Sequence, residues 1–294
     1  MDIIKPQIIT PSLLISSNVP ENDAPLWTST SYNVGQQVIY NHRLYQAILN
    51  NNNKRPDLYP DKWLDLGATN RYRMFDNIVG NPTTNLNTID FTVTTGTIID
   101  GIALFNVVAA SVRVIVTDPI LGVVYDQTLS LEDFSEITSC FAYWFNPVGE
   151  RSNEIVFLNI GNYPQASVRV IIDNGTETAS CGEAVLGTQH NIGVSNFGTT
   201  IGIRDYSRKE VDEFGSFTIV QRTFSKIADY EVTFETSSLG AVQKYLASIR
   251  ATPVVFIGDG NRSETIIYGF YKGFSIVIAT PTISDGTIQV EGLT

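Results

Sequence analysis

Alternation of apolar and polar residues constrains the fold of this chain more than any other feature of its sequence. Runs at 89–94 and 112–116 place apolar side chains at every second position, whereas 102–105, 155–158 and 168–172 are mostly apolar throughout. A period of two predicts a strand with one buried face, and a short apolar run predicts a more fully buried strand. With turn signals between them, such short strands predict a two-sheet β-sandwich, jelly-roll-like, over residues 68–180.

One internal match falls inside this predicted sandwich. The segment 110–116 (ASVRVIV) recurs as 166–172 (ASVRVII). Seven residues do not establish a duplication, so we interpret the two segments as equivalent strands of one sandwich. Arg113 and Arg169 then point to the outer face, where surface ion pairs are expected rather than ligand contacts.

The last part of the chain, 181–294, has a different pattern. Glycines become frequent from residue 182, which suits a twisted or bulged sheet. Ser237 or Ser238 is positioned to cap a helix whose apolar residues lie three or four apart, and Thr252-Pro253 ends it. Further strands follow at 254–257, 265–268 and 274–278. We predict an α+β C-terminal assembly domain with one helix on a sheet, in a chain that is mainly β.

The first 26 residues contain four prolines, each of which removes a backbone donor and disfavours helix before it. We predict an extended N-terminal arm over 1–26. Apolar patches at Ile3-Ile4 and 13–15 predict that the arm packs on its own domain or on a neighbour. A disordered terminus is the alternative.

Residues 27–67 are rich in aromatic side chains. Gln37–Tyr40 and 44–47 are predicted to be two strands joined by a turn at 41–43. The ordered set across this stretch resembles the chitin-binding type 3 (family 5/12) carbohydrate-binding module. The positions that carry the resemblance are Trp27, Tyr32, Gly35, Val38, Tyr40, Tyr45, Ala47, Pro56 and Trp63.

The resemblance implies a sugar-binding role for the rings, because exposed aromatic side chains of that family form a platform for stacking sugars. The implied site residues are Trp27, Tyr32, Tyr45, Tyr59 and Trp63. A piece of this size also needs its large rings to form a core, so the core and platform interpretations both stay open. Family members often carry one or two tryptophans after the Tyr-x-Ala element, where this chain has Ile48-Leu49-Asn50.

A second resemblance covers the C-terminal part. Segments of the chain are similar to bacteriophage tail proteins that carry an N-terminal carbohydrate-binding-like module: 181–183, 201–207, 212–215, 251–253 and 268–272. This resemblance implies a protein of the virion tail, near the tail tip or baseplate. Other phage tail proteins, further copies of the chain in a homo-oligomer, and a host cell-surface polysaccharide are the expected partners.

Charge excludes other partners. The net charge of −11 and pI of about 4.6 repel phosphate backbones and anionic lipids, so we expect no nucleic acid partner. No apolar run approaches the roughly 18 residues of a membrane span, so no membrane insertion is expected either. The first residues lack a signal-peptide pattern, which predicts assembly in a host cytoplasm.

Metal and cofactor sites are not expected. The chain has two histidines, His42 and His190, and two cysteines, Cys140 and Cys181, without a Cys-x-x-Cys or His-Glu-x-x-His pattern. We predict that His42 is an exposed turn residue and His190 a hydrogen-bonding loop residue. The cysteines are predicted to be buried free thiols.

No catalytic residues are predicted. A nucleophile elbow and a phosphate loop are both missing. Glycoside hydrolysis needs only two carboxylates, and the densest acidic group is Asp205, Glu210, Asp212 and Glu213. Basic residues lie between them, which predicts ion pairing in a solvated loop or a polar interface.

Three functions remain. The first is a structural protein of a phage tail tip or baseplate that also contacts host glycans through its N-terminal module. The second is a dedicated carbohydrate-binding protein for receptor recognition. The third is a polysaccharide hydrolase with an attached binding module.

Overall fold

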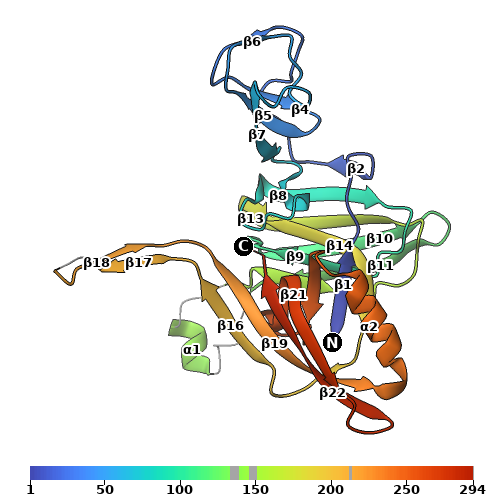
Figure 1. The fold of residues 1–294 in the computed structure, drawn as a ribbon. Helices are drawn as coiled ribbons and strands as arrows, with labels where there is room; N and C mark the ends of the chain where they lie inside the picture. The colour runs from blue at the N-terminus through green and yellow to red at the C-terminus, as the bar shows by residue number, and fades with distance from the viewer. Residues whose placement is uncertain (133–138, 146–150, 212–213, 294) are drawn as a thin grey trace.

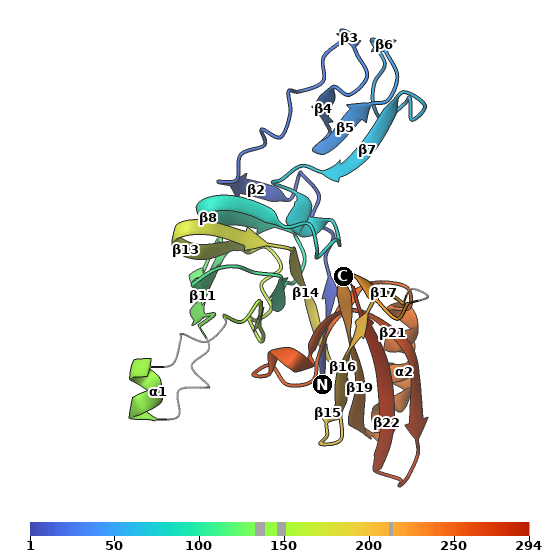
Figure 2. The same cartoon turned by 90° about the vertical axis from the view of Figure 1, so that its left-hand side faces the viewer.

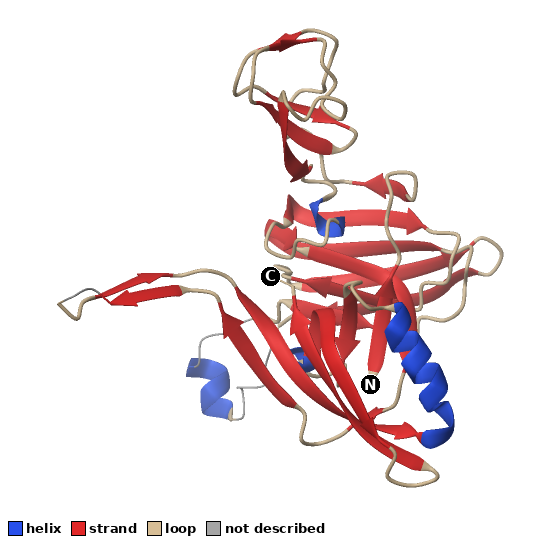
Figure 3. Ribbon diagram, viewed as in Figure 1, coloured by secondary structure: helices blue, strands red, loops and turns tan. Residues whose placement is uncertain are grey.

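The computed structural model describes residues 1–132, 139–145, 151–211 and 214–293. It is mainly β, as predicted, with 53% of residues in strands and 8% in helices (Figure 1, Figure 3). Two large sheets make up the body, and a small module and a two-stranded ribbon project from it.

The first large sheet has five antiparallel strands. Its order is β11 (Gly122–Ser130), β10 (Ser111–Asp118), β13 (Ser167–Cys181), β8 (Thr83–Thr94) and β2 (Leu14–Ser17). The longest strand, β13, changes register with β8 between Asp173 and Thr178. Gly175, with φ of +64°, lies inside this irregularity, which fits the role of glycine in a bulge.

The second large sheet has ten strands. Its order is β12 (Glu154–Phe157), β9 (Gly101–Phe105), β14 (Glu183–Asn191), β1 (Asp2–Pro6), β20 (Val254–Ile257), β21 (Ile266–Val277), β22 (Ile283–Gly292), β19 (Phe224–Glu235), and then β15 (Val194–Ser195) and β16 (Thr200–Asp205), which both pair with β19. The sheet curls, so that Glu154 on β12 meets Lys226 on β19 at 2.7 Å. Burial raises the pKa of Glu154, while the ammonium of Lys226 opposes that shift.

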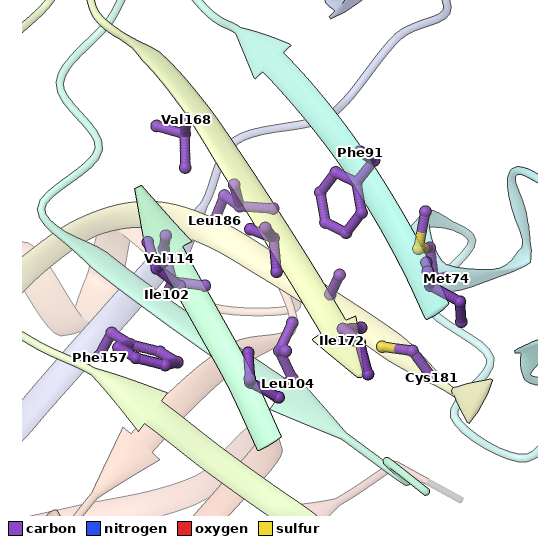
Figure 4. Close-up of a cluster of buried hydrophobic side chains, with 14 of the residues drawn as sticks. Met74, Phe91, Ile102, Leu104, Val114, Phe157, Val168, Ile172, Cys181 and Leu186 are labelled. Carbon is purple, nitrogen blue, oxygen red and sulfur yellow. The ribbon is translucent and has the colours of Figure 1, made fainter. Parts of the chain in front are cut away.

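The predicted sandwich is formed by the five-stranded sheet and one end of the curled sheet. The largest apolar cluster joins side chains of β8, β10 and β13 to side chains of β9, β12 and β14. Figure 4 shows Phe91 and Val168 on one side of this core, and Ile102 and Phe157 on the other. Because β13 ends at Cys181 and β14 begins at Glu183, the chain passes there from the first sheet to the second.

The two repeated segments lie side by side. They form β10 and β13, paired antiparallel with Val114 opposite Val170. Arg113 binds Asp126 and Arg169 binds Asp90, both at 2.6 Å and at the surface. The predicted strands and the predicted ion pairs are confirmed.

The N-terminal segment is built into both sheets. β1 lies between β14 and β20, in the interior of the curled sheet, and β2 pairs with β8 in the other sheet. Ile3 and Ile4 are fully buried and belong to different apolar clusters, since an interior strand covered on both faces needs apolar side chains on both. This segment therefore connects the two large sheets.

The predicted helix on a sheet is confirmed as α2 (Leu239–Ser248), which follows the short 3-10 helix η2 (Thr236–Ser238). Val242 and Leu246 pack from α2 into the apolar cluster of the curled sheet. Ser238 occupies the predicted N-cap position, but its side chain makes no capping hydrogen bond. Its hydroxyl donates to the carbonyl of Glu235 instead.

One described helix was not predicted. α1 (Cys140–Phe145) has a sequence rich in apolar residues, yet Phe141 and Trp144 are 70% and 71% exposed. The prediction of two buried thiols holds for Cys181 and is wrong for Cys140, which is exposed. Burial strongly raises the pKa of the Cys181 thiol.

The mixed charges of the segment 204–215 predict a solvated loop or a polar interface, and its described residues are not a loop. Its described residues continue from β16 into β17 (Arg208–Val211), which pairs with β18 (Phe217–Val220). Figure 1 shows this β17–β18 ribbon extending away from the body. Asp212 and Glu213 lie outside the described residues.

The aromatic module projects at another end of the molecule (Figure 1, Figure 2). It consists of the three-stranded sheet β4 (Gln37–Tyr40), β5 (Arg43–Ala47) and β7 (Trp63–Ala68), and of the pair β3 (Ser31–Tyr32) and β6 (Asn51–Asn52). The 3-10 helix η1 (Arg73–Phe75) follows it at the body, and η3 (Ser263–Thr265) precedes β21.

Candidate functional site

The hairpin of the aromatic module sets the direction of its rings. β4 and β5 pair with Tyr40 opposite Arg43, so Asn41 and His42 alone form the turn. Both have positive φ, 49° and 61°, as a two-residue type I′ turn requires. The predicted hairpin is confirmed, with one residue fewer in its turn.

Three of the five implied site residues lie in the module core. Tyr32, Tyr45 and Trp63 are 8%, 9% and 2% exposed. Trp63 packs edge-on against Tyr32 at 5.1 Å between ring centroids, and its indole N–H donates to the carbonyl of Lys54 at 2.9 Å. A ring enclosed in this way has no face left for a sugar, so these three side chains support the module.

The other two implied site residues, Trp27 and Tyr59, are half-buried at the edge of the same core. Trp27 meets Tyr40 edge-on at 5.7 Å. Lys54 lies 4.5 Å from the centre of the Tyr59 ring and Arg55 lies 5.3 Å from that of Tyr40. A sugar that stacks on either tyrosine competes with a cation for the ring.

The module also exposes aliphatic side chains that the sequence did not mark as functional. Val34, Ile48, Leu49 and Leu58 are between 43% and 62% exposed. Ile48 and Leu49 occupy the place after the Tyr-x-Ala element where the resembled family often has tryptophan. The outward-facing apolar surface of this module is therefore aliphatic as well as aromatic.

A polar cluster joins the module to the body. The carboxylate of Glu21 contacts His42 Nδ1 at 2.9 Å, accepts a hydrogen bond from Thr69 Oγ1 at 2.8 Å, and lies 3.7 Å from Arg71. The ring of His42 packs on Tyr72, 4.5 Å between centroids. The prediction of a plain exposed turn residue is wrong for His42. Its ring connects the hairpin turn to Glu21 and Tyr72, which lie on either side of the module in the sequence.

Two carboxyl groups lie near each other, Glu183 at the start of β14 and Asp76 directly after η1. Glu183 is 4% exposed and accepts a hydrogen bond from the amide of Asn77 at 2.9 Å. Burial, reinforced by the nearby Asp76, raises the pKa of Glu183 to about 8. Burial also raises the pKa of Asp76, so burial is the principal cause of the shift in both carboxyl groups.

The densest acidic group of the sequence is ion-paired where the structure describes it. Asp205 lies 2.9 Å from Lys209, and Glu210 pairs with Arg208. Hydrogen bonds from Ser207 and Lys209 lower the pKa of Asp205. The predicted pairing is confirmed for these two carboxylates, and Asp212 and Glu213 fall outside the described residues.

His190 is not the predicted loop residue. It lies on β14 opposite Ile3, and its ring packs 4.3 Å from the ring of Tyr245 on α2. Within the described ranges, no group of three or more His, Cys, Asp or Glu residues is placed to hold a metal ion. No helix in this part of the chain has both the length and the apolarity to cross a membrane.

No protein-family model matches the sequence, and a search of curated proteins finds no match.

Proposed function

We propose that this chain is a structural component of a bacteriophage tail tip or baseplate, where it assembles with other tail proteins and with copies of itself. The observation that carries the proposal is the β17–β18 ribbon, which holds apolar side chains out in solvent. Phe217 and Ile219 are 70% and 65% exposed. The ribbon extends away from the body, and contiguous exposed apolar side chains indicate a surface that another protein covers.

Further apolar side chains are exposed elsewhere on the body. Ile120 and Leu121, at the turn between β10 and β11, are 89% and 68% exposed, and Phe197, between β15 and β16, is fully exposed. These sites lie on different elements. Separate apolar patches suit a subunit with several neighbours, and the sequence resemblance to tail proteins supplies the class of neighbour.

The aromatic module is proposed to contact a host surface polysaccharide. Trp27 and Tyr59 are the two implied site residues that are not enclosed in the core. Stacking on one or two rings gives weak binding, and many copies on one particle turn weak contacts into stable adhesion. The alternative function is a dedicated carbohydrate-binding protein for receptor recognition. The module is compatible with this function and with the structural one.

Catalysis is not part of the proposal. Asp205 pairs with Lys209 and Glu210 pairs with Arg208. The pKa of Asp205 is lowered by hydrogen bonds from Ser207 and Lys209, whereas the general acid of glycoside hydrolysis needs a raised pKa. Turnover of a host polymer that is lost in Asp205→Asn or Glu210→Gln would overturn this part of the proposal.

The assembly role is tested on particles. Antibodies raised against the purified chain are used for gold labelling of negatively stained particles, with mass spectrometry of the same preparation. We expect the chain in the particles and gold at the distal end of the tail. A chain that stays in the lysate and leaves the particles unlabelled contradicts the proposal.

The glycan contact is tested on an array with particles and with the free chain. Trp27→Ala combined with Tyr59→Ala is expected to remove particle binding, and Leu58→Ala, which changes an exposed aliphatic neighbour, is expected to retain it. Equal binding by both variants would assign the contact to another surface.

A further inference from the structure

The aromatic module differs in charge from the rest of the chain. Residues 27–67 contain four basic and three acidic side chains, so they contribute +1 to the net charge of −11, and the other residues contribute −12. The module projects from the body, with β6 at its far end (Figure 1, Figure 2). At physiological ionic strength, exposed charges more than about 8 Å apart are largely screened from each other. A ligand near β6 therefore meets the charges of the module rather than those of the acidic body.

Ion pairs compensate all but one of the charges in the module. Each of its three acidic side chains pairs with a basic one: Asp57 with Arg55 at 2.6 Å, Asp65 with Arg43 at 2.8 Å, and Asp61 with Lys62 at 3.5 Å. Lys54 is the remaining cation, and it forms no ion pair with any residue that the structure describes. The uncompensated positive charge of the module is therefore located at Lys54, two residues after β6.

The ammonium of Lys54 lies over an aromatic ring. Its Nζ is 4.5 Å from the centre of the Tyr59 ring, within the range in which a cation is attracted to the face of a ring. Tyr59 is half-buried and packs against the module core. A sugar that stacks on the ring of Tyr59 therefore has to displace the ammonium of Lys54.

Displacement of the ammonium has different consequences for neutral and anionic sugars. A neutral sugar removes the contact between cation and ring and offers the ammonium no opposite charge. A sugar with a carboxylate or phosphate group offers it a charge-assisted hydrogen bond, which is stronger than a neutral one. The long stem of lysine is flexible, so Nζ follows the anionic group while the sugar ring takes its place on Tyr59. The contact between Lys54 and Tyr59 thus favours anionic sugars over neutral ones.

A second contact between a cation and a ring lies next to the first. Arg55 follows Lys54 in the sequence and lies 5.3 Å from the centre of the Tyr40 ring, which meets Trp27 edge-on at 5.7 Å. Arg55 is already paired with Asp57, so the uncompensated charge stays at Lys54. Because the two cations are consecutive, Tyr59 and the rings of Tyr40 and Trp27 lie on neighbouring parts of the module, which suits a polymer of sugars.

We propose that the module binds an anionic polysaccharide, with sugar rings on Tyr59 and Trp27 and a carboxylate or phosphate group on the ammonium of Lys54. This inference rests on the proposed glycan contact and names the chemical class of the glycan. The acidic body repels an anionic polymer that lies along it, so the contact is confined to the projecting module.

Substitutions of two lysines separate the local charge from the total charge of the module. Lys54→Gln removes the charge over Tyr59 and keeps the backbone carbonyl of residue 54, which accepts the hydrogen bond of the Trp63 indole. Lys54→Arg keeps the charge and is expected to retain binding. Lys62→Gln is the matched control, because it removes the same charge from the same module at a lysine paired with Asp61. Circular dichroism and tryptophan fluorescence check that each variant is folded.

Biolayer interferometry with the immobilised full chain compares soluble polymers that differ in charge and in sugar content. Polygalacturonate carries carboxylates, its methyl ester is the same polymer without them, a polymer of N-acetylglucosamine 1-phosphate carries phosphates, and inorganic polyphosphate has charge without a sugar ring. We expect an anionic sugar polymer to bind about tenfold more tightly than the ester and polyphosphate. Lys54→Gln should lose about tenfold of this affinity, and Lys62→Gln less than about twofold. Binding of one anionic sugar polymer and not of the other supports the inference and identifies the anionic group.

Equal binding of polygalacturonate and its methyl ester, or equal binding by wild type and Lys54→Gln, overturns this inference and leaves the proposed glycan contact standing. Equal losses in Lys54→Gln and Lys62→Gln also overturn it, because the total charge of the module would then account for binding. Polyphosphate that binds as tightly as the sugar polymers would show that no ring takes part. A chain that binds none of the polymers overturns the inference, and the array with particles then decides separately whether the proposed glycan contact exists.

Discussion

The buried carboxyl of Glu183 makes the stability of the body depend on pH. Its pKa is about 8 in the folded chain, against an ordinary value of 4.5. The folded state therefore retains a proton that the unfolded state loses above pH 4.5. Since the unfolded state binds fewer protons there, the free energy of unfolding falls as pH rises from about 4.5 to about 8 and then levels off.

The size of this effect follows from the same values. A separation of 3.5 pH units, at 1.36 kcal/mol per unit, corresponds to at most about 5 kcal/mol. Glu183→Gln keeps an acceptor for the amide of Asn77 but has no proton to lose. The variant is expected to abolish most of the decline between pH 5 and pH 8, and to be more stable than the wild type at pH 8.

Urea unfolding at pH 5, 6, 7 and 8 measures the decline. Far-ultraviolet circular dichroism is the suitable signal, because Trp27 and Trp63 lie in the small module and their fluorescence reports mainly on it. Glu210→Gln, on the exposed ribbon, is the control and should leave the pH dependence unchanged. The reasoning is refuted when wild type and Glu183→Gln lose stability in parallel between pH 5 and pH 8.

Three further predictions concern packing. Trp63→Ala removes the central ring of the module and should destabilise it by about 3–5 kcal/mol, seen as loss of native tryptophan fluorescence, whereas Leu58→Ala should not. Ile4→Ala in the interior strand β1 should lower the free energy of unfolding, measured with urea, by about 2–5 kcal/mol. Ile8→Ala, at a position 79% exposed, should change it little. Equal losses in the two variants would contradict the placement of β1. Arg169→Gln should change stability by less than about 1 kcal/mol, because surface ion pairs contribute little, and a loss of several kcal/mol would show that the pair with Asp90 is structural.

The strands of the sandwich were predictable because their signal is local. Apolar residues at alternate positions of β10 and β13 specify which face is buried and leave Arg113 and Arg169 on the other. Helix α2 was predictable for the same reason, since its apolar residues recur at helical spacing. The missing capping hydrogen bond was not predictable, because a 3-10 turn before the helix moves the Ser238 hydroxyl toward the carbonyl of Glu235.

Long-range placement was not predictable. The sequence indicates an extended segment at Ile3-Ile4, but only the completed sheet shows that β14 and β20 enclose it. The mixed charges of 204–215 predicted a solvated loop or a polar interface. The strands there were missed because strand residues exposed on every side have no one-sided burial to reveal them. The order of the sheets depends on pairings between distant residues.

The candidate site was only partly predictable, because core rings and platform rings are the same residue types. Sequence selected the five rings together, and their burial separated Tyr32, Tyr45 and Trp63 from Trp27 and Tyr59. The groove of about 1010 Å³ beside α2 had no sequence signal at all. Residues of α2, η2, β14, β15, β19 and β22 line it, and these elements meet only in the folded chain.

Hydrogen–deuterium exchange of residues 208–220 tests most directly whether the chain works through surfaces that assembly covers. The segment is compared in dilute free chain and in purified particles. The account predicts fast exchange in the free chain and strong protection in the particle, with the Leu86 region of β8 as an internal reference. Equally fast exchange in both would show that the ribbon stays in solvent, and the account would be wrong.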